Sequence, residues 1–364
     1  MEDPIIIVGA GLSGLYAASI LHKRGIECTV LESRARIGGR VLSEAVDKRP
    51  DLGKFDLGPT WFWPQHEPII THLIQKLHLE TFDQYTEGAI LLEQSQNTRA
   101  HRHLLPHGAA DRSVRLVGGI ESLTDKLANT LPHGTVKKNT RVVEIHMNEE
   151  EALTVEASSI SGDKKIYRAR AVILALPPRI VAENITFTPA LSQGLIERLH
   201  HKPTWMAGQG KVIAVYDHPF WREDGLSGQA MSWAGPLQEI HDASPQTGGG
   251  ALFGFFGIDA KIRQELGREK LLEMVIEQLT RLFGTSANRL ITLLYKDWFQ
   301  DPATAVEDDL IPLTSFPNYG PPTNAEIWKG KIVFAGTETS HHFGGHLEGA
   351  LYSAERASLK VMEL

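Results

Sequence analysis

The sequence predicts an α/β fold in which a Rossmann-like domain that binds a dinucleotide is interleaved with a smaller α+β domain. Two observations lead to this prediction. Near the N-terminus, a short apolar run is followed by glycines at positions 9, 11 and 14. Near the C-terminus come residues 334–339 (Phe-Ala-Gly-Thr-Glu-Thr) and 347–350 (Leu-Glu-Gly-Ala). We expect these two ends of the chain to close on one long ligand.

The N-terminal segment predicts a strand, a tight turn and a helix. Residues 5–8 are apolar and fit a buried parallel strand, whereas residues 15–21 begin an apolar helix. Between them, Gly9 permits the turn, Gly11 lets backbone N–H groups approach a pyrophosphate, and Gly14 allows close packing of helix and strand. The phosphates would then meet free N–H groups at the helix N-terminus. The same turn holds two further predicted contacts, Leu12 and Ser13.

A second strand and an acidic residue follow at the expected distance. Residues 28–31 (Cys-Thr-Val-Leu) fit a strand, and Glu32 stands at its end. This is about 20 residues beyond the glycines, where a ribose contact is required. Ser33 and Arg34 come next, and we include them in the predicted cofactor site. For Arg34 and Arg36, an exposed loop charge is an equally good interpretation.

A second glycine-rich, basic turn indicates which dinucleotide binds. A nicotinamide cofactor needs no such turn after the first strand–helix–strand unit. FAD does need one, because its pyrophosphate and isoalloxazine ring extend further. Arg40 can balance phosphate charge with the fork geometry of its guanidinium. The residues predicted to contact FAD here and shortly afterwards are Gly39, Arg40, Gly58, Pro59, Thr60 and Trp61.

The chain resembles the flavin-containing amine oxidase family, which includes monoamine and polyamine oxidases and several L-amino acid oxidases. The matching stretches are residues 8–40, 56–61, 116–120, 211–221 and 334–356. The resemblance implies that Val142 contacts the adenine through its backbone, and that Gly336 and Glu338 meet the pyrophosphate region. It also implies that Leu347 and Glu348 open a helix whose N–H groups face the pyrimidine end of the flavin. A helix N-terminus stabilises the negative charge of the reduced ring there.

The same resemblance implies three catalytic residues. Lys211, at the start of a predicted strand over residues 211–216, would hold a water against the flavin N5 atom and help oxygen accept electrons. An ordinary strand-end lysine in solvent is the alternative. Trp298 would lie beside the flavin ring, although a large aromatic side chain also fits a core position. His346 stands where the second tyrosine of an aromatic cage is found in monoamine oxidases.

The sequence does not decide between the possible classes of amine substrate. The first cage tyrosine would fall near Glu307 or Asp308, so the tyrosine pair is missing and simple arylalkylamines are in doubt. Acidic residues facing the cavity would favour a cationic, polyamine-like substrate, with Trp61 and Trp63 as aromatic walls. An amino acid substrate needs an arginine for its carboxylate. The candidates for that role are Arg222 and Arg102.

We expect two interleaved domains. The FAD-binding domain is predicted to comprise residues 1–78, 113–184 and 302–364, and the substrate domain residues 79–112 and 185–301. In the family, a long helical insertion normally precedes the Val-Gly-Gly turn. Here that space holds only residues 81–115, so the helical cover of the active site is predicted to be missing and the cavity more open.

Composition excludes several classes of protein. The net charge is −7 without a basic run, which offers no footprint for nucleic acid. No apolar stretch approaches the length of a membrane span, and the first strand begins too early for a cleavable signal, so we expect a cytoplasmic protein without a membrane association. The single cysteine, Cys28, lies in the second strand. In the family that the chain resembles, the monoamine oxidases of animals attach their flavin to a cysteine near the C-terminal region. This chain has none there, so we expect non-covalent FAD.

Two groups of closely spaced histidines could in principle bind a metal ion, but we do not predict such a site. They are His101, His103 and His107, and His341, His342 and His346. Cysteines and a helical His-x-x-x-His pattern beside a glutamate are both missing, so the ligand pattern is poor. We therefore predict no metal site.

Together these features predict a flavoprotein oxidoreductase. The leading hypothesis is an FAD-dependent oxidase of the C–N bond in a primary amine, polyamine or amino acid, using O₂. Its products are an imine or aldehyde, ammonia or an amine, and hydrogen peroxide. One alternative is a flavin dehydrogenase or desaturase acting on a C–C bond. The other is a flavin-holding subunit whose cleft is completed by a partner protein.

Overall fold

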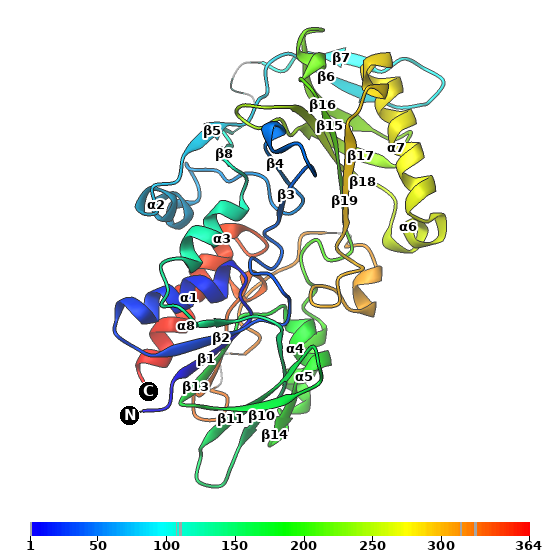
Figure 1. Ribbon diagram of the computed structural model, residues 1–364. Helices are drawn as coiled ribbons and strands as arrows, with labels where there is room; N and C mark the ends of the chain where they lie inside the picture. The colour runs from blue at the N-terminus through cyan, green and yellow to red at the C-terminus, as the bar shows by residue number, and fades with distance from the viewer. Residues whose placement is uncertain (1, 107, 109–110, 314, 324–325) are drawn as a thin grey trace.

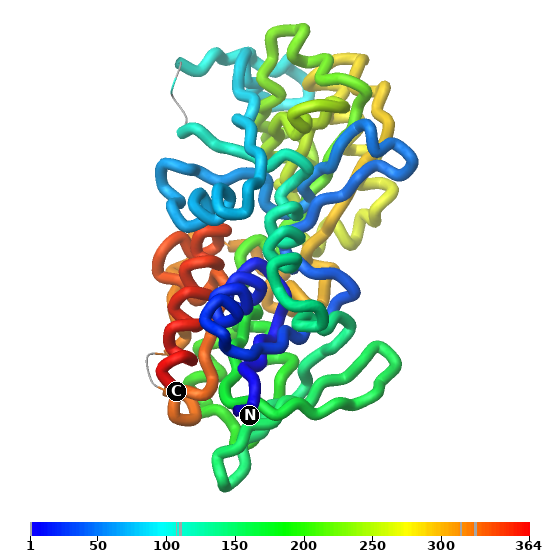
Figure 2. Tube along the Cα trace, turned by 60° about the vertical axis from the view of Figure 1, so that its left-hand side comes forward, coloured from blue at the N-terminus to red at the C-terminus, as the bar shows by residue number. Residues whose placement is uncertain are grey.

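The computed structural model describes residues 2–106, 108, 111–313, 315–323 and 326–364. Two regions are evident in the ribbon (Figure 1). The lower region holds both termini, and the upper region is built on a long twisted sheet. The trace in Figure 2, turned to another side, shows the chain crossing between the regions several times, so the two regions are interleaved as predicted.

A five-stranded parallel sheet forms the centre of the lower region. Its strand order is β20-β13-β1-β2-β9, and β1 pairs with both β13 and β2 over its whole length. The strands are β1 (Ile5–Val8), β2 (Cys28–Leu31), β9 (Val136–Lys137), β13 (Ala171–Leu174) and β20 (Ile332–Phe334). This order is typical of a dinucleotide-binding sheet, with β1 in the middle and the ligand site at its carboxyl end.

Strand β1 explains why the N-terminal apolar run has no polar residue. Ile5 and Ile7 pack into a core with the helices, whereas Ile6 and Val8 pack into a second core on the opposite face. Both faces of the sheet are therefore covered, as parallel sheets require. The helical face is formed by α1 (Leu12–Lys23), α3 (Glu121–Ala128) and α8 (Leu347–Met362).

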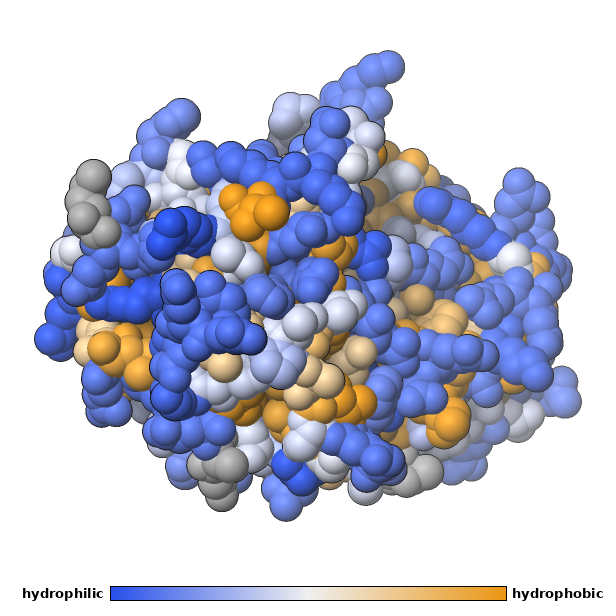
Figure 3. All heavy atoms as spheres, turned by 90° about the horizontal axis from the view of Figure 1, so that it is seen from below, coloured by the Kyte–Doolittle hydropathy of each residue, from blue (hydrophilic) through white to orange (hydrophobic). Residues whose placement is uncertain are grey.

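The opposite face is covered by a second, four-stranded sheet of order β12-β11-β10-β14. Its strands are β10 (Thr140–Met147), β11 (Leu153–Ser159), β12 (Lys164–Ala169) and β14 (Thr186–Thr188). Helices α4 (Pro178–Asn184) and α5 (Gln193–His200) pack against each other beside it. The face of the molecule seen from below carries scattered apolar residues among many hydrophilic ones (Figure 3).

The upper region contains a seven-stranded sheet of order β19-β15-β18-β17-β16-β6-β7. Its strands are β6 (Ala89–Glu93), β7 (His101–His103), β15 (Gly210–Tyr216), β16 (Leu226–Ser232), β17 (Leu237–Asp242), β18 (Gly250–Phe256) and β19 (Thr292–Asp297). Helices α6 (Ala260–Leu266) and α7 (Arg268–Phe283) cover one face of it. Every residue of β15 is buried, because this strand lies between β18 and β19 and both of its faces are packed.

The strand pairing differs from the predicted domain boundary at residue 185. Strand β14 pairs in parallel with β10, and α5 packs on α4, so residues up to about 200 lie with the lower region. The chain adds one more strand to the four-stranded sheet before it crosses over, and local sequence pattern cannot reveal that pairing. We therefore propose a boundary after α5 and keep the remaining boundaries as predicted.

The short segment of residues 81–115 contains strands where the family insertion is helical. They are β5 (Thr81–Asp83), β6, β7 and the first residues of β8 (Val114–Leu116). Among its described residues, no helix is present. The elements just before it are β3 (Ser43–Ala45), β4 (Lys54–Asp56) and α2 (Pro68–Lys76). No helix in the described ranges combines the length and the apolar character needed to cross a membrane.

Candidate active site

Two adjoining cavities meet at the carboxyl end of the parallel sheet. One has a volume of about 360 Å³ and reaches from the first glycine turn into the upper region. The other, of about 1000 Å³, lies between β2 and β10. They share the wall residues Gly9, Glu32, Arg34, Leu176 and Ala303. The two cavities therefore form one elongated site, the shape that a dinucleotide with a long tail requires.

Two glycine turns face each other and form the cradle of this site. Helix α1 begins after Gly11 with no side-chain cap, so its first N–H groups remain available. A Cβ atom on Gly14 would lie 2.0 Å from the Gly9 carbonyl oxygen, and one on Gly39 would lie 3.3 Å from the Cα of Gly11. A side chain at Gly14 would therefore push α1 away from β1, and one at Gly39 would crowd the first turn. Gly9, Gly11 and Gly39 line the cavity without side chains, as close approach to a pyrophosphate demands. Leu12 and Ser13 line the same wall.

Glu32 lies at the junction of the two cavities. Its side chain is buried and accepts hydrogen bonds from the N–H groups of Ala10 (2.8 Å) and Arg34 (2.9 Å). The Ser33 hydroxyl donates to the same carboxylate at 3.3 Å. The backbone contacts fix both carboxylate oxygens, and an ionised carboxylate is a good acceptor for the hydroxyls of a ribose.

The interpretation of Arg34 as an exposed loop charge is wrong. Its guanidinium donates to Asp301 at 2.7 Å and to the Thr304 hydroxyl at 2.8 Å. The Arg36 guanidinium is also engaged, since it donates to the carbonyl oxygens of Ile37 and Gly39. Arg34 therefore links the end of β2 to the segment that follows β19.

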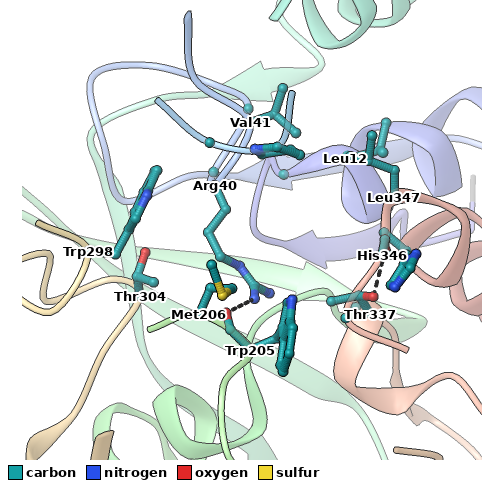
Figure 4. A pocket seen from close by; sticks show the side chains of 18 of the residues that line it. Leu12, Arg40, Val41, Trp205, Met206, Trp298, Thr304, Thr337, His346 and Leu347 are labelled. Carbon is teal, nitrogen blue, oxygen red and sulfur yellow. Dashed lines mark hydrogen bonds between the residues drawn. The ribbon is translucent and has the colours of Figure 1, made fainter. Parts of the chain in front are cut away.

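Arg40 and Glu338, both predicted to face the pyrophosphate, contact each other. The guanidinium and carboxylate form two hydrogen bonds of 2.6 and 3.0 Å, and Glu338 is fully buried. Arg40 also donates to the carbonyl of Trp205, which is drawn in Figure 4. Burial disfavours the cation, but the carboxylate of Glu338 holds the pKa of Arg40 above its usual value. The charge of Arg40 is therefore already compensated within the protein.

The two ends of the chain meet behind this pair. The N–H of Gly336 donates to the hydroxyls of Ser13 and Ser353, each at 3.0 Å. Helix α8 begins at Leu347, as predicted, and Leu347 lines the cavity. The side chain of Glu348 does not line it. Its carboxylate accepts hydrogen bonds from the first N–H groups of α2, at 2.9 and 2.8 Å, so any cofactor contact by Glu348 rests on its backbone N–H alone.

Val142 lies at the far end of the larger cavity. It is a buried residue of β10, and the ladder between β10 and β11 shifts register between Val142 and Glu144. Val142 lines this cavity, where the resemblance puts the adenine.

Lys211 is buried on the wall of the smaller cavity, so the alternative of a lysine in solvent is wrong. Its ammonium donates to the Gly58 carbonyl at 2.9 Å and to the Thr60 hydroxyl at 2.6 Å. It also lies 4.0 Å from the ring centroid of Phe253. Burial lowers the pKa of Lys211 to about 7, with the carboxylate of Asp56 opposing the shift. A titratable cation thus faces the cavity near neutral pH.

Aromatic side chains surround this lysine. Trp298 is buried, lines the cavity, and donates from its indole to the Leu57 carbonyl at 3.1 Å. Pro59 and Trp61 line the same wall. The ring of Trp61 lies 5.6 Å from that of Phe253. The wall therefore combines one cation with large apolar surfaces.

A buried carboxylate that sequence reasoning missed faces the cavity beside His346. The Nδ1 atom of His346 lies 3.0 Å from a carboxylate oxygen of Glu67, which is buried just before α2. The other oxygen of Glu67 accepts from the N–H of Trp63 at 2.8 Å. The rings of Trp63 and His346 are 5.6 Å apart. Glu67 belongs to no recognisable sequence motif. Its role could not be predicted, because the residue that it contacts lies in a distant segment of the chain.

Several substrate-site candidates lie away from the cavity. Glu307 and Asp308 are exposed at the start of a short 3-10 helix. Arg102 is exposed on β7, and Arg222 forms an ion pair with Asp242. None of these four residues lines the smaller cavity.

The first histidine group is only partly described. His101 and His103 are exposed on β7, and His107 lies outside the described residues. Across the part of the chain that the structure describes, no group of three or more His, Cys, Asp or Glu side chains is arranged to hold a metal ion.

Two family models match consecutive parts of the chain. Residues 82–362 match the family described as flavin containing amine oxidoreductase, and residues 7–77 match an NAD(P)-binding Rossmann-like domain. A Mycobacterium tuberculosis protein named as a flavin-containing monoamine oxidase is 25% identical, over 99% of this chain and 96% of its own. That alignment spans 457 positions, more than the 364 residues present here, so this chain lacks segments that the relative has.

Further relatives and solved structures agree in fold. Putrescine oxidase from Kocuria rosea is 24% identical, over 100% of this chain and 95% of its own. A structure of putrescine oxidase bound to putrescine superposes with a TM-score of 0.80 at 22% identity, covering 100% of both chains. Cyclohexylamine oxidase from Brevibacterium oxydans gives a TM-score of 0.80 at 19% identity, covering 100% of this chain and 99% of its own.

Proposed function

Because this chain belongs to the flavin-containing amine oxidoreductase family, we propose that it oxidises the C–N bond of a cationic diamine or polyamine with O₂. FAD is the cofactor of this family, and the bare glycine cradle, the Glu32 carboxylate and the start of α8 fit it. The observation that carries the reaction with O₂ is the Lys211 side chain, buried on the cavity wall between Thr60 and Phe253. The buried carboxylate of Glu67 on the same wall supports the cationic substrate.

The chemistry divides between the cofactor and the protein. When bound, FAD supplies a two-electron acceptor for a hydride equivalent from the carbon next to the amine nitrogen. In sum, the amine, O₂ and water give an aldehyde, ammonia or a shorter amine, and hydrogen peroxide. The protein contributes orientation and electrostatics. Lys211 would place positive charge beside oxygen as it accepts electrons, which is the kind of preorganised stabilisation that lowers such barriers.

The lining of the cavity favours a cationic substrate. Trp61 and Trp63 offer aromatic faces, which attract ammonium groups, whereas the Phe253 ring already contacts Lys211. Glu67 adds a buried carboxylate on the same wall. The two arginines on the wall, Arg34 and Arg40, are each paired with an acid. A substrate carboxylate would therefore find no unpaired guanidinium there, which disfavours an amino acid.

We also propose that FAD is held without a covalent bond. Cys28 is in β2, does not line the smaller cavity, and burial raises its pKa to about 11, so a thiolate is disfavoured. Precipitating the holoprotein with acid is expected to release all of the flavin into the supernatant. Flavin that stays with the pellet would contradict this.

Anaerobic bleaching of the bound flavin tests the proposed function. Putrescine, spermidine, benzylamine and a set of L-amino acids are added separately to the oxidised holoprotein. We expect bleaching by the diamine or polyamine, and recovery on admitting air with one hydrogen peroxide per flavin. Bleaching by amino acids alone would overturn the substrate class. A flavin that only dithionite reduces would favour C–C oxidation or a partner-dependent protein.

A further inference from the structure

We propose that His346 and Glu67 form a dyad that removes a proton from the substrate ammonium before oxidation. This inference rests on the proposed function. An alkylammonium group has a pKa near that of lysine, about 10.4, so the amine arrives charged at neutral pH. Hydride removal from the adjacent carbon needs the neutral nitrogen with its lone pair. A base on the cavity wall can accept the proton that the ammonium must lose.

The contact with Glu67 is the basis on which we assign Nε2 of His346 as the base. Nδ1 lies 3.0 Å from the carboxylate of Glu67. An ionised carboxylate only accepts hydrogen bonds, so Nδ1 must carry the proton and Nε2 keeps a free lone pair. Glu67 is itself held, because its second oxygen accepts from the N–H of Trp63. The arrangement resembles the orienting carboxylate of other histidine bases.

The position of His346 suits proton transfer. The residue caps the start of α8, and its backbone carbonyl accepts from the Thr337 hydroxyl at 2.7 Å, as drawn in Figure 4. Its side chain is 33% exposed, whereas that of Glu67 is 2% exposed. Among the described residues, Nε2 has no hydrogen-bond partner. The ring is therefore anchored at one nitrogen and available at the other.

The proton balance needs no additional reactant. An N–H bond of the ammonium breaks, and an Nε2–H bond forms on His346. The resulting imidazolium faces the Glu67 carboxylate, and its proton leaves through the exposed edge of the ring to solvent. The neutral amine then remains in the cavity, and the imidazole is restored for the next turnover.

Other ionisable groups lie near the dyad, and their titration must be distinguished from that of His346. Glu348 follows on α8, but its carboxylate is occupied by the N–H groups of Ile69 and Ile70. Lys211 and the Arg40–Glu338 pair lie on the same cavity wall. None of them is hydrogen-bonded to the His346 ring, so substitution at His346 leaves their contacts in place.

The test compares anaerobic flavin reduction in the wild type, His346→Gln and Glu67→Gln, each as holoprotein, with the amine that bleaches wild-type flavin fastest. At pH 7 we expect His346→Gln to be about 100-fold slower, within the range of general-base catalysis. The deficit should shrink towards pH 10, where the free amine is present in solution. In Glu67→Gln the rate of flavin reduction should fall less at pH 7, and this deficit should also shrink towards pH 10. His342→Gln is the matched control, since that ring packs on Tyr352 outside the cavity.

A second readout does not depend on turnover. Protein with ¹⁵N-labelled histidine is compared with His346→Gln to assign the His346 resonances. We expect a neutral ring protonated at Nδ1 in the wild type, and a loss of this preference in Glu67→Gln. An Nε2-protonated ring, or equal pH profiles of reduction in the wild type and His346→Gln, would overturn the dyad. If no amine reduces the flavin of the wild type, the proposed function fails instead. The ¹⁵N measurement of the His346 tautomer then still shows whether Glu67 orients the ring.

Discussion

The two halves of the elongated site are built in different ways. The cofactor half is formed largely by main chain and by charges that pair within the protein; its lining residues are Gly9, Gly11, Glu32, Gly39, Arg40 and Glu338. Gly14 supports this half from behind the wall, where α1 packs closely on β1. The substrate half is formed by side chains; its residues are Trp61, Trp63, Glu67, Lys211, Phe253 and His346. The first half therefore depends on steric room for the backbone, whereas the second depends on the chemistry of single side chains.

The largest effect is expected where a side chain enters the cofactor half. In Gly14→Val, the new Cβ would meet the Gly9 carbonyl at 2.0 Å, so β1 and α1 must separate and the pyrophosphate cradle is lost. We expect protein without bound flavin, measured as the ratio of visible flavin absorbance to protein. Gly194→Ala is the control, because its Cβ meets only Arg198 at 3.6 Å, within helix α5. It should keep full flavin and be as stable as the wild type or slightly more so.

A polar substitution in the substrate half should leave flavin bound and change the reaction. For Lys211→Met, we expect reoxidation of the reduced flavin by O₂ to slow about 100-fold, the size of effect seen when one preorganised donor is removed. Stopped-flow mixing of anaerobically reduced protein with oxygenated buffer measures it.

The pH dependence of this step follows from the same lysine. The pKa of Lys211 lies at about 7, so its positive charge is present below that pH and is lost as the pH rises through it. The wild-type oxygen reaction should therefore slow above pH 7, and that of Lys211→Met should be flat. A variant with slow reduction but normal reoxidation would place Lys211 in amine binding instead.

An aromatic wall should contribute less than a catalytic cation. Trp61→Ala removes one face from the cavity, and a cation–π contact is worth about 0.5–2 kcal/mol. This corresponds to a rise in KM for a diamine of about 2- to 30-fold, with kcat changed less. Steady-state peroxide release measures both constants. Trp233→Ala serves as control, because Trp233 is 62% exposed and lies away from the cavity. Equal KM values in the two variants would remove Trp61 from the substrate half.

The sequence predicted the cofactor half far better than the substrate half. The strand, the glycine turn, Glu32 and the start of α8 are contiguous signals, and each lies where it was expected. Lys211 was singled out by the family resemblance of its segment, and its burial at the cavity shows that it is no solvent lysine. These features depend on local pattern and on the requirement for backbone space.

Contacts between distant segments could not be predicted in this way. Glu67 and His346 are 279 residues apart, as are the N–H of Ile69 and the carboxylate of Glu348 that accepts from it. The pairing of Arg40 with Glu338 joins two residues that were each assigned to the phosphates separately. The contacts of Glu67 and Glu348 accompany the packing of α2 against α8, and the Arg40–Glu338 pair joins the second glycine turn to the segment before α8. Neither arrangement has a signature in local periodicity.

The smallest effect is expected outside both halves, at the arginines once considered for a substrate carboxylate. Arg102 is exposed on β7, and among the described residues its guanidinium donates to the carbonyl of Asp224 alone, at 3.1 Å. In Arg102→Gln we therefore expect kcat and KM for the best amine to change less than about twofold, since exposed polar contacts of this kind contribute little. Arg222 is a poorer test, because removing it would leave the buried carboxylate of Asp242 with hydrogen bonds from Trp221 and Ser244 but without its ion-pair partner. If Arg102→Gln instead raised KM for an L-amino acid and left diamines unaffected, carboxylate recognition would reach well beyond the cavity wall. The substrate half would then have to be extended to the edge of the seven-stranded sheet.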